Sequence, residues 1–328
     1  MLASSLVAQA RSLRSRGEWA EVCVLLEGET GSVGESLELS LILAEAWMRT
    51  GRPAEARRLL RDALLDVEGY DPDSALRSAV NLCGAAHFEL GELAEAVSAF
   101  ERALELSTDA ADDLVAARAT NNLALIANIH GEHDEALARY RTAIPMYQRL
   151  GNPVGLAESF HNMAITYRDL NQLEEADEHE LRAIEFARQV ENERLVAIAL
   201  VGRAEVALRR GDASMAEATA LRAADDFLDN RDPARRADAL RLAGVARMAR
   251  GRHTGARELV EAAVALAHSC GATLIEAECL RARGELSVVD GDRDAAIADA
   301  IAAIELFTQL GAQGERDALE AWVLGLRS

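Results

Sequence analysis

The sequence predicts an all-α solenoid of about eight helical hairpins followed by one capping helix. Three observations predict it. Turn-forming residues recur every 40 residues, small residues recur at fixed distances from those turns, and helix-capping residues recur with the same period. Each hairpin buries its apolar side only by stacking on its neighbours, so a regular repeat of this kind indicates a solenoid.

The turn positions carry residues that tolerate the left-handed backbone with which many helices end. From the second position onward each step is 40 residues, whereas the first step is 34. The turn residues are Gly17, Gly51, Gly91, Gly131, Asn171, Gly211, Gly251 and Gly291.

Small residues occupy two further positions in every regular repeat. Closely packed helices need small side chains at the contact, because a larger one costs about 1–3 kcal/mol. Five residues after the turns stand Ala56, Ala96, Ala136, Ala176, Ala216, Ala256 and Ala296. Seven residues before the turns stand Ala10, Ala44, Gly84, Ala124, Ala164, Ala204, Gly244 and Gly284.

In chain order, each hairpin is expected to begin at an N-cap residue. The N-caps are Asp71, Asp112, Asn152, Asn192 and Asp232, and three of them precede a proline suited to the first helical turn. The hairpins are expected at 1–34, 35–71, 72–111, 112–151, 152–191, 192–231, 232–271 and 272–311, with a capping helix at 315–326. We predict one continuous domain over 1–328, because the repeats of a solenoid contact only their neighbours.

Two positions depart from this regularity. The first repeat has Val22 and Glu29 where alanine is expected, as is typical of terminal repeats that cap a stack. Pro145 lies inside the second helix of the fourth repeat, where the missing hydrogen bond predicts a kink.

The pattern resembles the tetratricopeptide repeat. Residues 40–47, 80–87 and 160–167 follow the spacing W-x2-L-G-x2-Y, and 96–100 follows A-x3-F. The period of 40 instead of the usual 34 implies longer helices. With NNLA at 121–124, the repeats are similar to those of Pins/LGN, kinesin light chain and the sensor regions of bacterial regulators. The resemblance implies a right-handed solenoid whose first helices line a concave, non-catalytic binding groove.

Composition excludes several classes of function. The net charge is −20, and all 35 basic residues are arginine. Without lysine there is no Walker-A lysine, kinase lysine or Schiff-base lysine. The charge is −7 over 1–100 and −9 over 101–200, which disfavours nucleic acid and anionic membranes. We expect a neutral or basic protein or peptide partner, no nucleic acid and no membrane, and leave the oligomeric state open.

The cysteines favour a reducing compartment. Cys23, Cys83, Cys270 and Cys279 form no CxxC pair, which indicates free thiols. No apolar run approaches the length of a membrane span. The start resembles a signal peptide but lacks a basic n-region, and it fits the register of the first helix. We therefore expect a cytoplasmic protein.

The resemblance implies that positions 2, 5, 6, 9, 12 and 13 of the first helices face the groove. The predicted groove residues are Ser78, Asn81, Phe88, Arg118, Asn121, Asn122, Leu125, Asn128, Glu158, His161, Asn162, Ile165, Arg168, Glu205, Arg241 and Arg281. An amide side chain both donates and accepts, so a row of asparagines suits a peptide backbone. Arg118 and Arg168 are expected to add contacts to carboxylates.

The predicted asparagines differ in the roles that they can have. Asn122 and Asn162 fit a scaffold role inside the stack as well as a groove role, whereas Asn81, Asn121 and Asn128 are expected to be exposed in the groove. Some family members clamp the acidic tail of a chaperone. That clamp is not predicted, because only Arg118 matches its basic and amide positions.

No catalytic or metal-binding constellation is expected. His130 and His133 span the turn instead of one helix face, which favours a solvated turn over a metal site. No cofactor is predicted, and an enzyme would require a hidden site. The main hypothesis is a non-catalytic interaction scaffold that binds a partner segment in its groove. The alternative is a sensor or regulatory subunit of a bacterial signalling or transcription-control system, acting on a separate effector chain.

Overall fold

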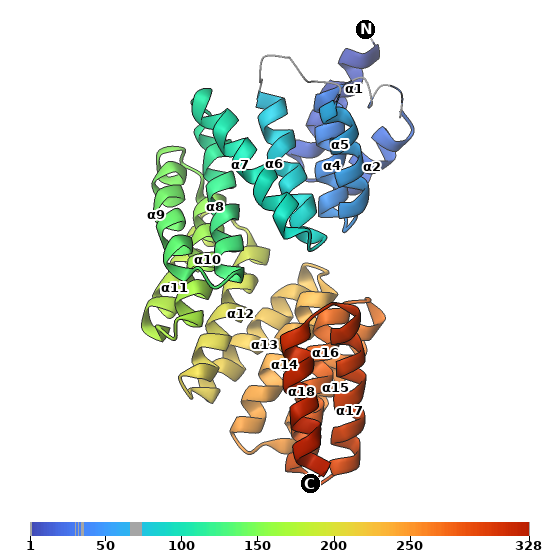
Figure 1. The fold of residues 1–328 in the computed structure, drawn as a ribbon, viewed down its shortest axis with the longest axis vertical. Helices are drawn as coiled ribbons and strands as arrows, with labels where there is room; N and C mark the ends of the chain where they lie inside the picture. Colours follow the sequence, from blue (N-terminus) through green and yellow to red (C-terminus); the bar gives the residue numbers. More distant parts are fainter. Residues whose placement is uncertain (1, 30, 32, 34–35, 66–73, 328) are drawn as a thin grey trace. The chain divides into compact units, whose positions relative to one another are not determined.

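The described part of the chain consists of α-helices joined by short turns (Figure 1). The computed structural model describes residues 2–29, 31, 33, 36–65 and 74–327. These residues divide into two compact units, 1–155 and 156–328. The predicted all-α repeat fold is thereby confirmed.

In the first unit, consecutive helices pair as antiparallel hairpins. The first helices of successive hairpins are also in contact, since α4 contacts α6 and α6 contacts α8. Its helices are α1 (Leu2–Ser15), α2 (Trp19–Glu27), α4 (Leu37–Arg49), α5 (Pro53–Leu65), α6 (Ser74–Glu89), α7 (Leu93–Asp109), α8 (Asp113–Ile129) and α9 (His133–Arg149). The expected N-cap Asp71, with Pro72, lies outside the described residues.

The second unit continues the pattern, and α12 touches α14 as α14 touches α16. Its helices are α10 (Pro153–Asp169), whose residues from 156 belong to this unit, α11 (Leu173–Gln189), α12 (Glu193–Arg209), α13 (Ala213–Asp229), α14 (Pro233–Ala249), α15 (His253–Ser269), α16 (Thr273–Val289), α17 (Arg293–Gln309) and α18 (Gln313–Arg327). The capping helix α18 begins two residues before the expected 315.

The small residues lie where the helices approach most closely. All seven alanines that follow the turns by five residues have 0% exposure. The glycines at the other small position are equally constrained, because a Cβ on Gly84 would lie 2.8 Å from the Phe100 ring and one on Gly244 would lie 2.5 Å from Val260. The prediction that small residues lie at the closest contacts between helices is confirmed.

The turns and caps also behave as predicted. Asn171 has a φ of 58° and the seven turn glycines have φ between 70° and 83°. Side chains of Asp112, Asn152, Asn192 and Asp232 accept hydrogen bonds from backbone N–H groups three residues on, at 2.9–3.2 Å. Two independent signals in the sequence therefore locate the helix starts and ends correctly.

Candidate functional site

The residues predicted to line a groove are divided between the two units. Those in the first unit lie on α6 and α8, and those in the second lie on α10, α12, α14 and α16.

In the first unit, three of the predicted asparagines are covered. Asn81, Asn121 and Asn128 are only 9%, 5% and 8% exposed, so the expectation that they are open to a ligand was wrong. In this unit α6 contacts both α4 and α8, the first helices of the neighbouring hairpins. The Asn128 side chain is also engaged locally, with its Oδ1 3.0 Å from His133 Nδ1.

The remaining candidates of the first unit keep some access to solvent. Arg118 is exposed on α8. The half-buried residues are Ser78, Phe88, Asn122 and Leu125.

In the second unit, α10, α12 and α14 enclose a hollow of about 200 Å³. It lies where the position counting predicts a binding face. We call it the α10–α14 hollow, and its lining residues are His161, Ile165, Arg168, Ile198, Val201, Gly202, Glu205, Phe227, Arg235 and Asp238. Of the predicted groove residues it brings together His161, Ile165, Arg168 and Glu205.

The other predicted residues of this unit do not line the hollow. Glu158 is exposed and Asn162 is half-buried on α10. Arg241 lies on α14 beside the lining residue Asp238, and Arg281 lies on α16, where it pairs with Glu278.

Apolar side chains from three helices form much of the wall. Ile165 belongs to α10, Ile198 and Val201 to α12, and the almost fully buried Phe227 to α13. The sequence analysis missed the last three. Ile198 and Val201 occupy positions 2 and 5 of their first helix, so the position counting already contained the signal for them. Phe227 lies on a second helix, and no signal pointed to it.

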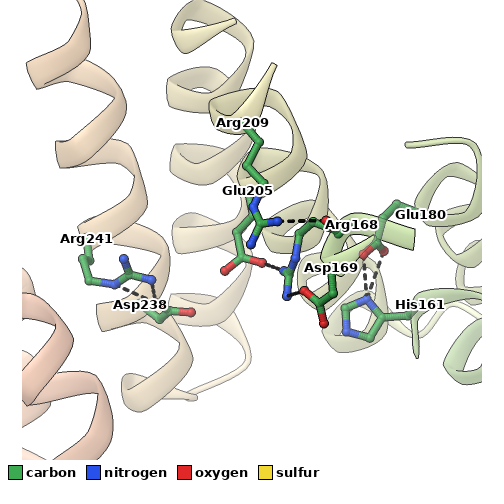
Figure 2. Close-up of polar contacts among 8 residues, drawn as sticks. All are labelled: His161, Arg168, Asp169, Glu180, Glu205, Arg209, Asp238 and Arg241. Atoms are coloured by element: carbon green, nitrogen blue, oxygen red, sulfur yellow. Dashed lines mark hydrogen bonds and ion pairs between the residues drawn. The ribbon is translucent and has the colours of Figure 1, made fainter. Parts of the chain in front are cut away.

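The charged groups at the hollow are paired with one another (Figure 2). Arg168 makes an ion pair with Glu205 on α12 and lies 3.5 Å from its neighbour Asp169. Arg209 donates a hydrogen bond of 2.8 Å to the carbonyl oxygen of Arg168. The guanidinium of Arg168, which was expected to contact a ligand carboxylate, is thus already paired with a carboxylate of the chain itself.

The same pairing continues on α14. Arg241 donates to Asp238 from Nη2 and Nε at 2.6 and 3.0 Å, as Figure 2 shows. Burial lowers the pKa of Arg168, whereas the pKa of Arg241 is raised because Asp238 outweighs the effect of burial. The hollow thus combines apolar side chains from three helices with the ion pairs Arg168–Glu205 and Arg241–Asp238 at its rim.

Among the described residues, no three or more His, Cys, Asp or Glu side chains are grouped to hold a metal ion. Within the same part of the chain, no helix is both long and apolar enough to cross a membrane.

Comparison with known families agrees with the repeat pattern. Family models described as tetratricopeptide repeat match residues 38–62, 75–149 and 115–189. Residues 38–62 and 75–189 of this chain carry tetratricopeptide repeats. Repeats of this family form protein-interaction scaffolds, and the chain is such a scaffold. A search of curated proteins found no match to the tetratricopeptide-repeat chain.

Solved structures share the fold of this tetratricopeptide-repeat protein. A Rap protein complexed with Competence and Sporulation Factor has a TM-score of 0.68 at 15% identity, over 99% of this chain and 97% of that chain. The apo form of RapI has a TM-score of 0.67 at 13% identity, over 84% and 99%. A signal transduction ATPase from Pyrococcus horikoshii with a tetratricopeptide repeat sensor has a TM-score of 0.67 at 15% identity, over 91% of this chain and 46% of that one.

Proposed function

We propose that this protein is a non-catalytic scaffold that binds a segment of a partner protein, or a free peptide, in the α10–α14 hollow. The observation that carries the proposal is the hollow itself. Eight of its ten lining residues occupy positions 2, 5, 6, 9 and 12 of first helices, the face that the repeat pattern assigns to binding. Concave, largely apolar sites with a few polar groups are where proteins usually bind ligands.

The hollow is suited to a side chain of a peptide. Its volume of about 200 Å³ accommodates one medium or large apolar side chain and little more. Ile165, Ile198 and Val201 offer that side chain a dry contact, and each such burial contributes about 1.5–3 kcal/mol. One anchored side chain with backbone contacts on either side matches recognition of an extended segment.

The experiment is a selection of random displayed peptides against the protein, followed by calorimetry on the selected peptides. Ile165→Asp places a carboxylate in the hollow and should weaken binding at least tenfold, because the charge meets an apolar ligand group. The matched control is Leu274→Asp on α16, where leucine is 54% exposed outside the hollow. Equal binding by the wild type and Ile165→Asp would show that the ligand sits elsewhere.

The second candidate function is a sensor or regulatory subunit that acts on a separate effector chain. It is favoured by the likeness in fold to the sensor-bearing ATPase, in which the matched region is 46% of the chain. A Rap protein of similar fold is complexed with a factor, which fits the same reading. Crosslinking in the source cells, with and without a selected peptide, should capture an effector chain whose yield the peptide changes.

A further inference from the structure

A buried carboxyl group lies directly behind the wall of the hollow. Glu180 on α11 is 1% exposed. It occupies the space that a side chain at position 202 would need, because a Cβ on Gly202 would lie 1.9 Å from Glu180 Oε1. Gly202 itself lines the hollow, so this carboxyl group is separated from the hollow by little more than the α12 backbone.

The described partner of Glu180 is a histidine that does face the hollow. His161 Nδ1 lies 3.0 Å from both carboxyl oxygens of Glu180. His161 lines the hollow and Glu180 does not. Figure 2 shows the second ring nitrogen, Nε2, on the side of the imidazole away from Glu180. The carboxyl group therefore orients the ring and leaves Nε2 for another contact.

The charges around the pair decide how many protons it holds. Arg168 on α10 favours the carboxylate, but its guanidinium is already paired with Glu205. Asp177 on α11 disfavours the carboxylate and is paired with Arg203 of α12 at 2.6 Å. Burial is the largest influence and raises the pKa of Glu180, while His161 opposes the rise.

These surroundings favour an uncharged pair over a single buried negative charge. The pair then holds one proton more than a carboxylate beside a neutral imidazole. Whether that proton sits on Glu180 or on Nδ1, the remaining hydrogen of the imidazole is on Nε2. His161 consequently presents an N–H donor until the pair loses its extra proton at higher pH.

We propose that His161 Nε2–H donates a hydrogen bond to a backbone carbonyl oxygen of the bound peptide, beside an apolar side chain that enters the α10–α14 hollow. The inference rests on the proposed function and adds the chemistry of the ligand. That ligand segment is uncharged, because Arg168 is already paired with Glu205 and Arg241 with Asp238 at the rim, as Figure 2 shows, and a charged group would have to displace one of these partners.

The test uses a selected peptide with an acetylated N-terminus, an amidated C-terminus and no titratable side chain. Its affinity is measured by calorimetry between about pH 6 and about pH 9, a range above the ordinary pKa of a glutamic acid side chain. The variant is His161→Phe with Glu180→Leu. Because both partners are replaced by apolar side chains, no buried polar group is left unpaired. The fold should therefore tolerate this double change better than either single substitution. Thermal unfolding checks that this variant is folded.

We expect the wild type to bind about tenfold more tightly than the double variant at low pH, the effect of one hydrogen bond. Its affinity should fall as pH rises and the pair loses its proton, while the double variant stays flat. His268→Phe is the matched control, since His268 Nδ1 lies 2.8 Å from Glu276 but outside the hollow. It should follow the wild type throughout.

The outcomes separate this inference from the proposed function. If Ile165→Asp abolishes binding but the double variant binds like the wild type, the peptide occupies the hollow and the role of His161 is wrong. A wild type whose affinity does not change with pH contradicts the role equally. If Ile165→Asp binds normally, the proposed function fails, and this inference fails with it.

Discussion

At the scale of single residues, the site depends on one glycine that makes room for one carboxyl group. Gly202 lies on α12 at position 6, which is asparagine in the two preceding repeats, at Asn122 and Asn162. Its missing side chain lets Glu180 reach His161 through a gap that any Cβ would close. The absence of a side chain at position 202 thus permits both the close approach of α11 to α12 and the contact that orients His161.

Gly202→Ala should therefore destabilise the fold, although alanine favours helices more than glycine does. The new methyl group must displace the buried Glu180 carboxyl, at a cost of about 1–3 kcal/mol in the free energy of unfolding, measured by urea denaturation. Gly314→Ala is the control, because that helical glycine has open space around its Cβ position. Equal stability of the two variants would mean that Glu180 moves aside without cost.

The thiols offer an independent check on the burial of side chains. Cys270 is exposed, whereas Cys23, Cys83 and Cys279 are buried. Burial raises the pKa of the Cys279 thiol to about 12 and also raises the pKa of Cys23 and Cys83. Since the thiolate is the reactive species, a chromogenic disulfide reagent should modify one thiol quickly and three only after unfolding. Cys270→Ser should abolish the fast phase, and a fast phase that survives it would contradict this assignment.

The sequence locates the site better than it describes the site's chemistry. Position counting assigned His161, Ile165, Arg168 and Glu205 to a groove, and these four residues line one hollow, whose role in binding stays a proposal. It did not reveal that Asn81 and Asn121 are covered, because exposure depends on how tightly neighbouring first helices pack. Nor did it pair Glu180 with His161, since the two residues lie on different helices and neither belongs to a recognised motif.

At the scale of helices and turns, the period predicted one of the two turns in each repeat. The turn inside each hairpin carries glycine or Asn171, and the sequence identified it. The turn between hairpins also has a left-handed residue, but Ala111, Glu191 and Arg231 stand there with φ of 54°, 52° and 54°. With no glycine at those three turns, the second periodic signal was hidden.

Pro145, expected to kink its helix, lies within α9, which continues to Arg149.

Arg231→Gly should stabilise the protein. A left-handed backbone costs a residue with a Cβ about 1–2 kcal/mol, and glycine largely avoids that cost. The greater flexibility of glycine in the unfolded chain offsets part of this gain. We expect a net increase of about 1 kcal/mol in the free energy of unfolding, measured as a rise in the thermal midpoint. Arg252→Gly is the matched control, because Arg252 has an ordinary φ of −96° and should gain nothing. A destabilised Arg231→Gly would show that the arginine side chain matters more than its backbone.

At the scale of the whole molecule, charge and the hollow favour related partners for different reasons. The net charge of −20 disfavours anionic polymers over the whole surface. The α10–α14 hollow favours an uncharged group because its rim is internally paired. A peptide with an uncharged segment for the hollow and basic flanking residues for the acidic surface meets both conditions. We therefore propose this kind of peptide as the neutral or basic partner expected from the sequence.

The single domain predicted over 1–328 remains a proposal, and the tryptophans allow a direct test. Trp19 and Trp47 lie in the unit 1–155, and Trp322 lies in the unit 156–328. Trp322→Phe leaves fluorescence from the first unit only, and the double variant Trp19→Phe with Trp47→Phe leaves it from the second only. If successive repeats are coupled as in one continuous stack, both proteins should unfold at the same urea concentration.

Adding Gly202→Ala to both reporter proteins makes this test sharper. Position 202 lies in the second unit, so coupled repeats should carry the loss of stability to Trp19 and Trp47 as well as to Trp322. Matching shifts of both midpoints support one cooperative domain. A shift confined to the Trp322 reporter would instead mean that 1–155 and 156–328 unfold separately, because coupling between neighbouring repeats is then too weak to transmit about 1–3 kcal/mol.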